Sequence, residues 1–258
     1  MAAVDKASVK PSDKVELSVG DVDAEFAKGG TIVGAHYLTP YCEQMPLEPL
    51  EPLNGTAMVS TDKFEMWHPS QHTTAVQESG GAPENVTVHQ TFVGGCFGRR
   101  VFSDDARMVV AVAKGYPGVP VHTIWSREVA TCQGRYRPLM AEYLMARLGE
   151  DSLPTALLAR IAGGPGFFTL GLAVTALPLV VENVQVESGV VPDFHVVTGP
   201  YRDLSYNSNI FFVESFVDEP ATAAKQDTPK YRIKLYSKWA DKGWVLVLNK
   251  LKTKSGWG

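Results

Sequence analysis

Alternation of apolar and polar residues predicts several strands in the first half of the chain. The stretch 31–40, TIVGAHYLTP, is rich in the β-branched and aromatic residues that strands favour. The stretch 56–70, TAMVSTDKFEMWHPS, contains two apolar runs on either side of Thr61 and Asp62, which predicts a hairpin that turns there. Within residues 86–92 a mainly apolar set, Val86, Val88, Gln90 and Phe92, alternates with polar residues over a β-branched background, so we expect a partly buried strand.

A glycine-rich stretch follows this third predicted strand, within VHQTFVGGCFGRR at 88–100. Gly94, Gly95 and Gly98 permit positive φ, and they let backbone amides approach a bound group. Such amides favour anions, but a tight turn with two arginines in solvent has the same composition, so both interpretations stay open. The patterns GxxxxGK[ST] and GxGxxG of nucleotide-binding loops are absent from this stretch.

Two short helices are predicted on either side of the glycine-rich stretch. The segment SQHTTAVQESGG at 70–81 begins with Ser70, a candidate N-cap, and ends with a glycine pair. The segment SDDARMVVAVAKGY at 103–116 begins with the cap candidate Ser103 and two aspartates, which suit the positive end of a helix. We expect Gly115 to end this second helix.

The second half of the chain has strand patterns followed by helical spacing. The strand patterns are VPVHTIWS at 119–126, LPTALLARIAG at 153–163 and VENVQVES at 181–188, and the helical ones are NSNIFFVESFVDE at 207–219 and KYRIKLYSKW at 230–239. Because a proline in a helix interior costs about 3 kcal/mol, we expect Pro220 to stop or kink the first of these helices near Asp218. Strands and helices together predict an α+β fold.

Composition places the chain among soluble globular proteins. Its 258 residues suffice for one large domain or two ordinary ones, and 45% of them are hydrophobic. The formal net charge is −4 and the basic residues are scattered, apart from the pair 99–100 and a lysine-rich C-terminal stretch, so no nucleic acid partner is expected. Cys42, Cys96 and Cys132 have no paired spacing, which indicates neither a disulfide framework nor a zinc site.

The N-terminal segment and the most apolar run of the chain match neither a secretory signal nor a membrane span. The first residues lack the basic and apolar regions of a secretory signal, and the polar segment 1–30 is expected to be poorly anchored. The run FFTLGLAVTALPLVV at 167–181 is shorter than the about 20 residues of a membrane span and contains a glycine and a proline. We therefore expect this run to be buried.

Seven segments occur in an order typical of one protein family: AHYLTPYCEQMPLEPLEPLNGTAMV, WHPSQHT, APENVTVHQTFVGGCFGRRVFSDDA, IWSRE, YRP, GPYR and NSNIFFVESFVDE. Together they resemble the molybdopterin-binding subunit of the xanthine dehydrogenase and aldehyde oxidase family, most closely its isoquinoline 1-oxidoreductase β-subunit branch. The resemblance covers nearly all of residues 20–258. It implies mixed sheets with packed helices, with a first cofactor-binding lobe at 31–118 and a truncated remainder at 119–258.

The resemblance also implies a reaction, a cofactor and partners. Members of the family are molybdenum-dependent oxidoreductases that hydroxylate an aldehyde or N-heterocycle with oxygen from water. The metal is held by a pterin, here expected as molybdopterin cytosine dinucleotide, and not by protein side chains. Iron–sulfur clusters are expected only on a small partner subunit, and a cytochrome c subunit is a further candidate partner. The resemblance suggests a bacterial periplasmic or membrane-associated complex.

Site residues follow from the resemblance by position. Gln71 matches a glutamine that hydrogen-bonds a molybdenum oxo group, a role that suits a neutral amide donor. Without the resemblance Gln71 would be read as a surface residue. Arg202 in GPYR matches the arginine of the substrate-pocket segment. The residues expected to bind the cofactor are Gln71, Gly94, Gly95, Cys96, Phe97, Gly98 and Arg202.

The chain departs from the family pattern at several positions. Cys96 replaces the third glycine of the usual GGGFG loop, and if that position needs positive φ the side chain costs on the order of 1 to 2 kcal/mol. Two expected substrate-pocket residues differ as well: Leu204 stands where related oxidases often have an aromatic, and Glu142 falls near a position that is an arginine in some members. The Leu-Glu-Pro repeat at 47–52 looks like an insertion.

The last departure is length. The chain ends at a point that corresponds to the middle of the family's subunit, before the glutamate that acts as general base. We therefore expect an internal piece that is inactive alone, with no catalytic residue of its own. Two alternatives remain: a non-catalytic remnant or structural half of a split subunit, and a phosphate-binding module that uses the glycine loop.

Overall fold

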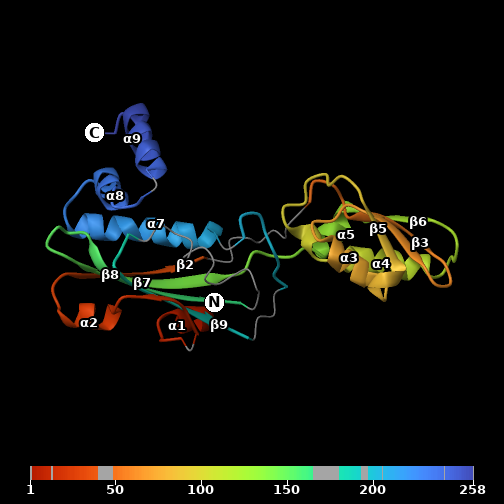
Figure 1. The fold of residues 1–258 in the computed structure, drawn as a ribbon, viewed down its shortest axis with the longest axis horizontal. Helices are drawn as coiled ribbons and strands as arrows, with labels where there is room; N and C mark the ends of the chain where they lie inside the picture. The colour runs from red at the N-terminus through yellow and green to blue at the C-terminus, as the bar shows by residue number, and fades with distance from the viewer. Residues whose placement is uncertain are drawn as a thin grey trace. The chain divides into compact units, whose positions relative to one another are not determined.

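The chain forms two compact units, each made of separate stretches of sequence (Figure 1). The computed structural model describes residues 2–12, 14–39, 49–164, 180–192, 197–204, 206–240 and 242–257. The larger unit comprises Met1–Tyr41, Pro138–Phe194 and Asp203–Gly258, and the smaller unit comprises Cys42–Arg137 and His195–Arg202. The chain thus leaves the larger unit and returns to it twice. The predicted boundary at residue 118 concerns cofactor-binding lobes and stays a prediction.

The larger unit contains a five-stranded sheet in the order β1-β9-β8-β7-β2. Its strands are β1 (Lys14–Val19), β2 (Ile32–Leu38), β7 (Met140–Leu148), β8 (Pro154–Gly163) and β9 (Asn183–Val190). Neighbouring strands are antiparallel, except that β8 and β9 are parallel. The strands predicted within 31–40, 153–163 and 181–188 are confirmed, whereas the sequence patterns did not predict β7.

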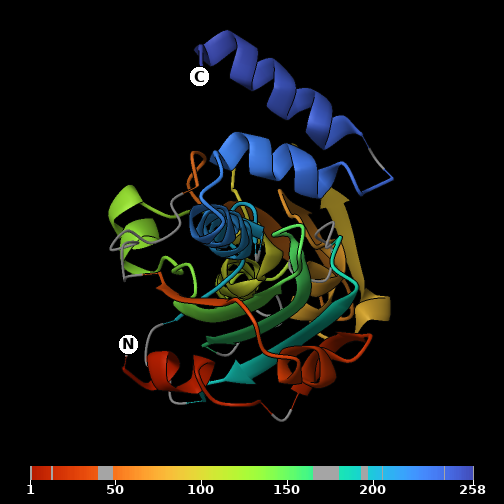
Figure 2. The same cartoon turned by 90° about the vertical axis from the view of Figure 1, so that its left-hand side faces the viewer.

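Helices cover both faces of this sheet. One face carries α1 (Ala2–Ser8) and α2 (Val22–Ala27), and the other carries α7 (Tyr206–Ala223), with α8 (Thr228–Tyr236) and α9 (Gly243–Ser255) beyond it (Figures 1 and 2). Successive side chains of β7 point to opposite faces of the sheet, and both faces are covered. Leu144 packs in the same core as Phe212 of α7, while Ala141 packs with Val4 of α1. The two helices predicted at 207–219 and 230–239 are confirmed as α7 and α8.

One expectation about the larger unit is wrong, and a second is wrong in part. The segment 1–30 is anchored, because β1 pairs with β9 and Val4 is buried in a core beneath the sheet. The helix α7 does not stop near Asp218 but runs through Pro220 to Ala223, whereas a kink at Pro220 stays a prediction. Proline removes a single N–H near the end of the helix, and the buried neighbours of Pro220, which pack against α8, compensate for that loss.

The apolar run at 167–181 lies outside the described residues except for its last two. Val180 packs beside the core that α7 and α8 share, and Val181 packs beside the core between α7 and the sheet. Within the described ranges, no helix combines the length and apolarity that crossing a bilayer requires.

The smaller unit contains a four-stranded sheet in the order β5-β4-β3-β6. Its strands are β3 (Asn54–Val59), β4 (Phe64–His68), β5 (Val86–Gln90) and β6 (Val121–Ile124), and its helical segments are α3 (Thr73–Ser79), η1 (Pro83–Asn85), η2 (Arg99–Val101), α4 (Asp104–Ala113) and α5 (Arg127–Cys132). The predicted hairpin is confirmed, since β3 and β4 pair and Ser60 N donates to Lys63 O at 2.8 Å across the turn. Residues of α3 and α4 share one core with the sheet.

The helices predicted at 70–81 and 103–116 are confirmed as α3 and α4, but their caps differ from the expectation. The residue that precedes α3 is His72, and the Ser70 hydroxyl accepts a hydrogen bond from His72 N at 2.8 Å instead of capping the helix. Ser103 precedes α4 as expected, yet its side chain makes no capping hydrogen bond. An α+β fold is therefore confirmed, with two mixed sheets and packed helices.

Candidate functional site

The glycine loop, defined here as residues 94–98, is held from one side by the end of the Leu-Glu-Pro repeat. Leu50 N donates to Gly95 O at 2.7 Å, and Glu51 N donates to Gly94 O at 3.2 Å. In return Gly94 N donates to the Glu51 carboxylate at 2.8 Å. Burial alone would raise the pKa of Glu51, but hydrogen bonds from Asn54 and Gly94 outweigh it and hold that pKa below its usual range. Residues 47 and 48 of the repeat lie outside the described residues.

The glycines of the loop are required by close packing of the chain against itself. Gly95 and Gly98 have φ values of +85° and +111°, which glycine adopts without strain. A Cβ at Gly98 would also lie 2.3 Å from the carbonyl oxygen of Pro200, and one at Gly94 would lie 2.8 Å from the Cβ of Glu51. Substitution at either position must therefore move the backbone or its neighbour.

Backbone strain in the loop falls on Phe97 and not on Cys96. Phe97 has a φ of +51°, a conformation that costs a side-chain-bearing residue about 1 to 2 kcal/mol. Cys96 does not have positive φ, and its thiol is buried at 4% exposure. Cys96 was expected to cost free energy only if its position needed positive φ. That condition is not met, because the residue with positive φ is Phe97. Strained residues cluster at functional sites, and Phe97 is 36% exposed.

Gln71 lies beside the loop, as the resemblance predicts. Gly98 N donates to Gln71 Oε1 at 3.1 Å, and Gln71 N donates to Arg100 O at 3.1 Å. Because a backbone N–H can only donate, this contact requires the oxygen of the Gln71 carboxamide to face the loop. Its Nε2 group has no acceptor among the described residues, so two N–H donors remain available beside the loop.

Backbone amides of the loop add further donors. Within the described part of the chain, the amides of Gly95, Cys96 and Phe97 donate to no protein acceptor. Consecutive N–H groups around residues of alternating φ sign form concave sites that attract anions. The loop and Gln71 together therefore present several N–H donors to an incoming group.

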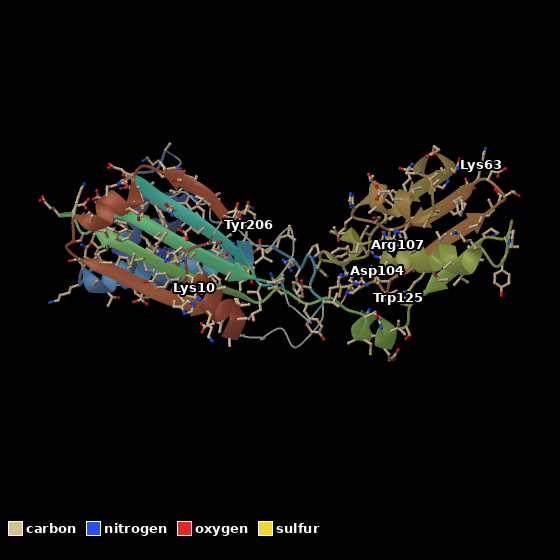
Figure 3. All side chains as sticks on the ribbon, turned by 90° about the horizontal axis from the view of Figure 1, so that it is seen from below. Lys10, Lys63, Asp104, Arg107, Trp125 and Tyr206 are labelled. Carbon is tan, nitrogen blue, oxygen red and sulfur yellow. The ribbon has the colours of Figure 1, made fainter. Side chains whose placement is uncertain are left out.

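The two arginines after the loop are buried, so a turn with both arginines in solvent is excluded. Both have 1% exposure. Arg99 makes a two-pronged ion pair with Asp104, at 2.8 and 2.7 Å, and lies 5.7 Å from the ring of Trp125; Figure 3 labels the last two residues. Arg100 donates to the Asp105 carboxylate at 3.2 Å. These side chains tie the loop to the start of α4.

A second segment, residues 197–202, brings the guanidinium of Arg202 to the glycine loop. The guanidinium of Arg202 lies 5.8 Å from the ring of Phe97, and its backbone oxygen accepts a hydrogen bond from Arg137 at 3.0 Å. Sequence reasoning placed Arg202 with the loop but missed Arg137, which lies over Tyr201 at 4.3 Å, and Arg135, which lies over the ring of Phe102 at 3.9 Å. The only sequence signal for these two arginines is the occurrence of arginines next to tyrosines in RYR at 135–137 and PYR at 200–202.

The two expected substrate-pocket residues belong to the larger unit. Leu204 is 40% exposed, just before α7. Glu142 lies in the middle of β7 with no exposed surface, and burial raises the pKa of its carboxyl well above the usual range. Their role in a substrate pocket stays a prediction. No three His, Cys, Asp or Glu side chains gather in a metal-binding arrangement within the described residues.

Comparison with known proteins gives one family. The model of the molybdopterin cofactor-binding domain matches residues 7–235. The aldehyde oxidoreductase molybdenum-binding subunit PaoC of Escherichia coli O157:H7 is 26% identical over 149 residues, which is 56% of this chain and 20% of PaoC. The chain therefore spans about a fifth of the length of the curated relatives it matches.

Solved structures share the fold at low sequence identity. Aldehyde oxidoreductase from Desulfovibrio gigas superimposes with a TM-score of 0.76 at 17% identity, over 96% of this chain and 29% of that chain. Quinoline 2-oxidoreductase from Pseudomonas putida 86 gives 0.73 at 16% identity, over 94% of this chain and 34% of that one. CO dehydrogenase from Oligotropha carboxidovorans gives 0.71 at 18% identity, over 93% and 34%.

Proposed function

The chain belongs to the family of molybdopterin cofactor-binding domains, and from that premise we propose that its smaller unit holds a molybdenum–pterin cofactor at the glycine loop. One observation carries the proposal. With the Gln71 oxygen held by Gly98 N, the Gln71 Nε2 group and the neighbouring amides of residues 95–97 are left without an acceptor among the described residues. An anionic group rich in oxygen acceptors fits this set of donors.

Each residue of the site has a role in binding. Gln71 would donate to an oxygen of the bound cofactor through Nε2 without adding charge, and the amides of residues 95–97 would help to hold the same anionic group. The ring of Phe97 offers an exposed flat surface to the pterin. Arg202, held over that ring, supplies positive charge for the phosphates of the dinucleotide form, molybdopterin cytosine dinucleotide.

The reaction and the partners are those that the family resemblance implies. When bound, the cofactor supplies the two-electron oxidation and the oxygen transfer that hydroxylate an aldehyde or N-heterocycle. A small iron–sulfur subunit and a cytochrome c subunit would carry the electrons away. Since the chain spans about a third of each solved relative, we expect it to bind the cofactor weakly and to show no turnover alone. One molybdenum per purified chain together with dye-linked turnover would contradict this expectation.

Binding of the pterin itself tests the proposal. Pterin cofactor released from a denatured molybdoenzyme is titrated into the native chain and into Gln71→Ala, and binding is followed by pterin fluorescence. Loss of one hydrogen bond should weaken binding about tenfold. Gln133→Ala, which replaces an exposed glutamine at the end of α5, is the matched control and should bind like the native chain.

Two results would contradict the proposal. One is a folded native chain that leaves the pterin fluorescence unchanged, and the other is equal binding by Gln71→Ala and Gln133→Ala. Inorganic phosphate competing at the same affinity as the pterin would instead favour the phosphate-binding alternative. Binding without turnover does not distinguish part of a catalytic subunit from a non-catalytic remnant or structural half. That alternative is tested by adding the C-terminal region of a relative and measuring whether turnover appears.

A further inference from the structure

Two consecutive carbonyl groups of the glycine loop face the segment 50–51. Gly94 O accepts a hydrogen bond from Glu51 N at 3.2 Å, and Gly95 O accepts one from Leu50 N at 2.7 Å. Successive carbonyls of an extended strand point in opposite directions, so two carbonyls on one side require a local change of the backbone. The positive φ of +85° at Gly95 supplies that change. The hydrogen bonds to segment 50–51 therefore fix how the loop backbone is turned.

This pairing also sets the direction of two loop amides. In a trans peptide unit, the C=O of one residue and the N–H of the next point in opposite directions. Since the carbonyls of Gly94 and Gly95 face segment 50–51, the N–H groups of Gly95 and Cys96 point away from it. Neither N–H group donates to an acceptor within the described residues. A single acceptor-rich group on the side of the loop away from segment 50–51 can therefore meet both.

The side chain of Glu51 holds the first residue of the loop. Its Oε2 accepts a hydrogen bond from Gly94 N at 2.8 Å and lies 3.6 Å from the Arg100 guanidinium, and its Oε1 accepts one from Asn54 at 2.8 Å. A hydrogen bond to a charged acceptor is about twice as strong as one between neutral groups. Glu51 thus binds both polar groups of the Gly94 backbone, the N–H through its carboxylate and the C=O through its own backbone N–H.

The segment that pairs with the loop is anchored by two arginines. Arg127 donates to Pro49 O at 2.6 Å and to Leu50 O at 2.9 Å. Arg100 donates to Pro52 O at 3.1 Å. The side chain of Leu50 is 72% exposed, so it adds little to a core. The segment therefore acts on the loop through its backbone and through the side chain of Glu51.

We propose that Glu51 is a positioning residue for the cofactor, because it holds Gly94 so that the N–H groups of Gly95 and Cys96 face the bound anionic group. Glu51 acts through the loop backbone, and its negative charge is balanced by Arg100. This role rests on the proposed function, because it concerns the same loop.

Hydrogen exchange of the Gly94 amide tests the contact between Glu51 and the loop without any ligand. The full chain is labelled with isotopic glycine, and exchange is followed by NMR. Glu51→Ala removes the acceptor and should accelerate exchange at Gly94 about tenfold or more. Glu51→Gln keeps an oxygen acceptor and should exchange at close to the native rate. The Gly118 amide, which donates to Val59 O at 2.8 Å in the same unit, should exchange at the native rate in both variants.

Pterin titration tests the consequence for binding. The probe is pterin cofactor released from a denatured molybdoenzyme. Glu51→Ala should bind it about tenfold more weakly than the native chain, whereas Glu51→Gln should retain most of the binding. Glu84→Ala removes an exposed carboxylate from η1 of the same unit, so it is the matched control and should bind like the native chain. Circular dichroism establishes that each variant is folded.

Four results would overturn the role of Glu51 alone. Folded Glu51→Ala leaves the exchange at Gly94 unchanged, accelerates it equally at Gly118 through a general loss of stability, or binds pterin as well as the native chain. The fourth result is that Glu51→Gln loses as much binding as Glu51→Ala. A native chain that binds no pterin, with exchange at Gly94 still faster in Glu51→Ala, would instead contradict the proposed function, and the positioning role would fail with it.

Discussion

Two buried polar clusters, one in each unit, differ in whether their groups are paired. In the smaller unit, Arg99 and Arg100 are almost completely buried and each is paired, with Asp104 and Asp105 respectively. In the larger unit, Glu142 and Asn209 are buried just as deeply and have no partner among the described residues. Paired groups fix the position of a loop, whereas unpaired groups cost stability unless something else meets them.

The largest expected effect comes from breaking a pair in the smaller unit. Asp105 accepts hydrogen bonds from Arg100 at 3.2 Å and from His68 at 3.1 Å, all three with almost no exposed surface. Asp105→Asn should therefore destabilise the chain by about 3 to 5 kcal/mol, because it removes the fully buried carboxylate that pairs with Arg100 and leaves the more distant Glu51 carboxylate, at 3.6 Å, to meet that buried charge. Urea unfolding measures the loss, with the exposed Asp62→Asn as control. A loss no greater than that of the control would show that Arg100 finds another partner.

A change of opposite sign is expected in the larger unit. Glu142→Leu removes two unsatisfied oxygens from an apolar core and should stabilise the chain by about 1 to 3 kcal/mol at neutral pH. Thermal and urea unfolding give the difference. If this substitution destabilised the chain as strongly as Asp105→Asn, Glu142 would have to be paired in the folded protein, and the contrast between the units would fail.

The pH dependence of stability sharpens the same contrast. Burial raises the pKa of Glu142 in the folded chain well above its value of about 4.5 in the unfolded chain. The unfolded chain then releases a proton that the folded chain keeps, so the contribution of Glu142 is fully present below the unfolded pKa and is lost as pH rises through the folded pKa. Relative to Glu142→Gln, the native chain should thus lose stability steadily from about pH 4.5 upward, as measured by urea unfolding at several pH values. Parallel curves for the two proteins would contradict the raised pKa.

The smallest effect is expected at Cys96. Since Cys96 is buried without positive φ, Cys96→Gly gains no backbone relief, loses a small packed side chain and adds chain entropy to the unfolded state. We expect a destabilisation of about 1 kcal/mol or less and pterin binding equal to that of the native chain, measured by thermal unfolding and fluorescence titration. Stronger pterin binding by the glycine variant would show that the thiol obstructs the cofactor.

Much of the fold could be predicted from local patterns. The hairpin around Thr61, the strand that enters the glycine loop and the helix α7 each follow from the period of their apolar residues. The strand β7 was missed because it is mostly buried, with apolar or small residues on both faces and hence no clear alternation. The association of Gln71 with the loop came from the resemblance, since no spacing rule joins residues 71 and 98.

By itself, then, the sequence determined the fold class, most of the strands and helices and the positive φ available to Gly95 and Gly98, because these depend on neighbours along the chain. The tertiary structure alone decided that Pro220 is tolerated, that the N-terminal segment adds a strand to the sheet and that strain falls on Phe97 instead of Cys96. It also decided which buried charges are paired. These features depend on contacts between residues that are distant in sequence. A local pattern does not say which distant residue will hydrogen-bond a buried group or pack against a core.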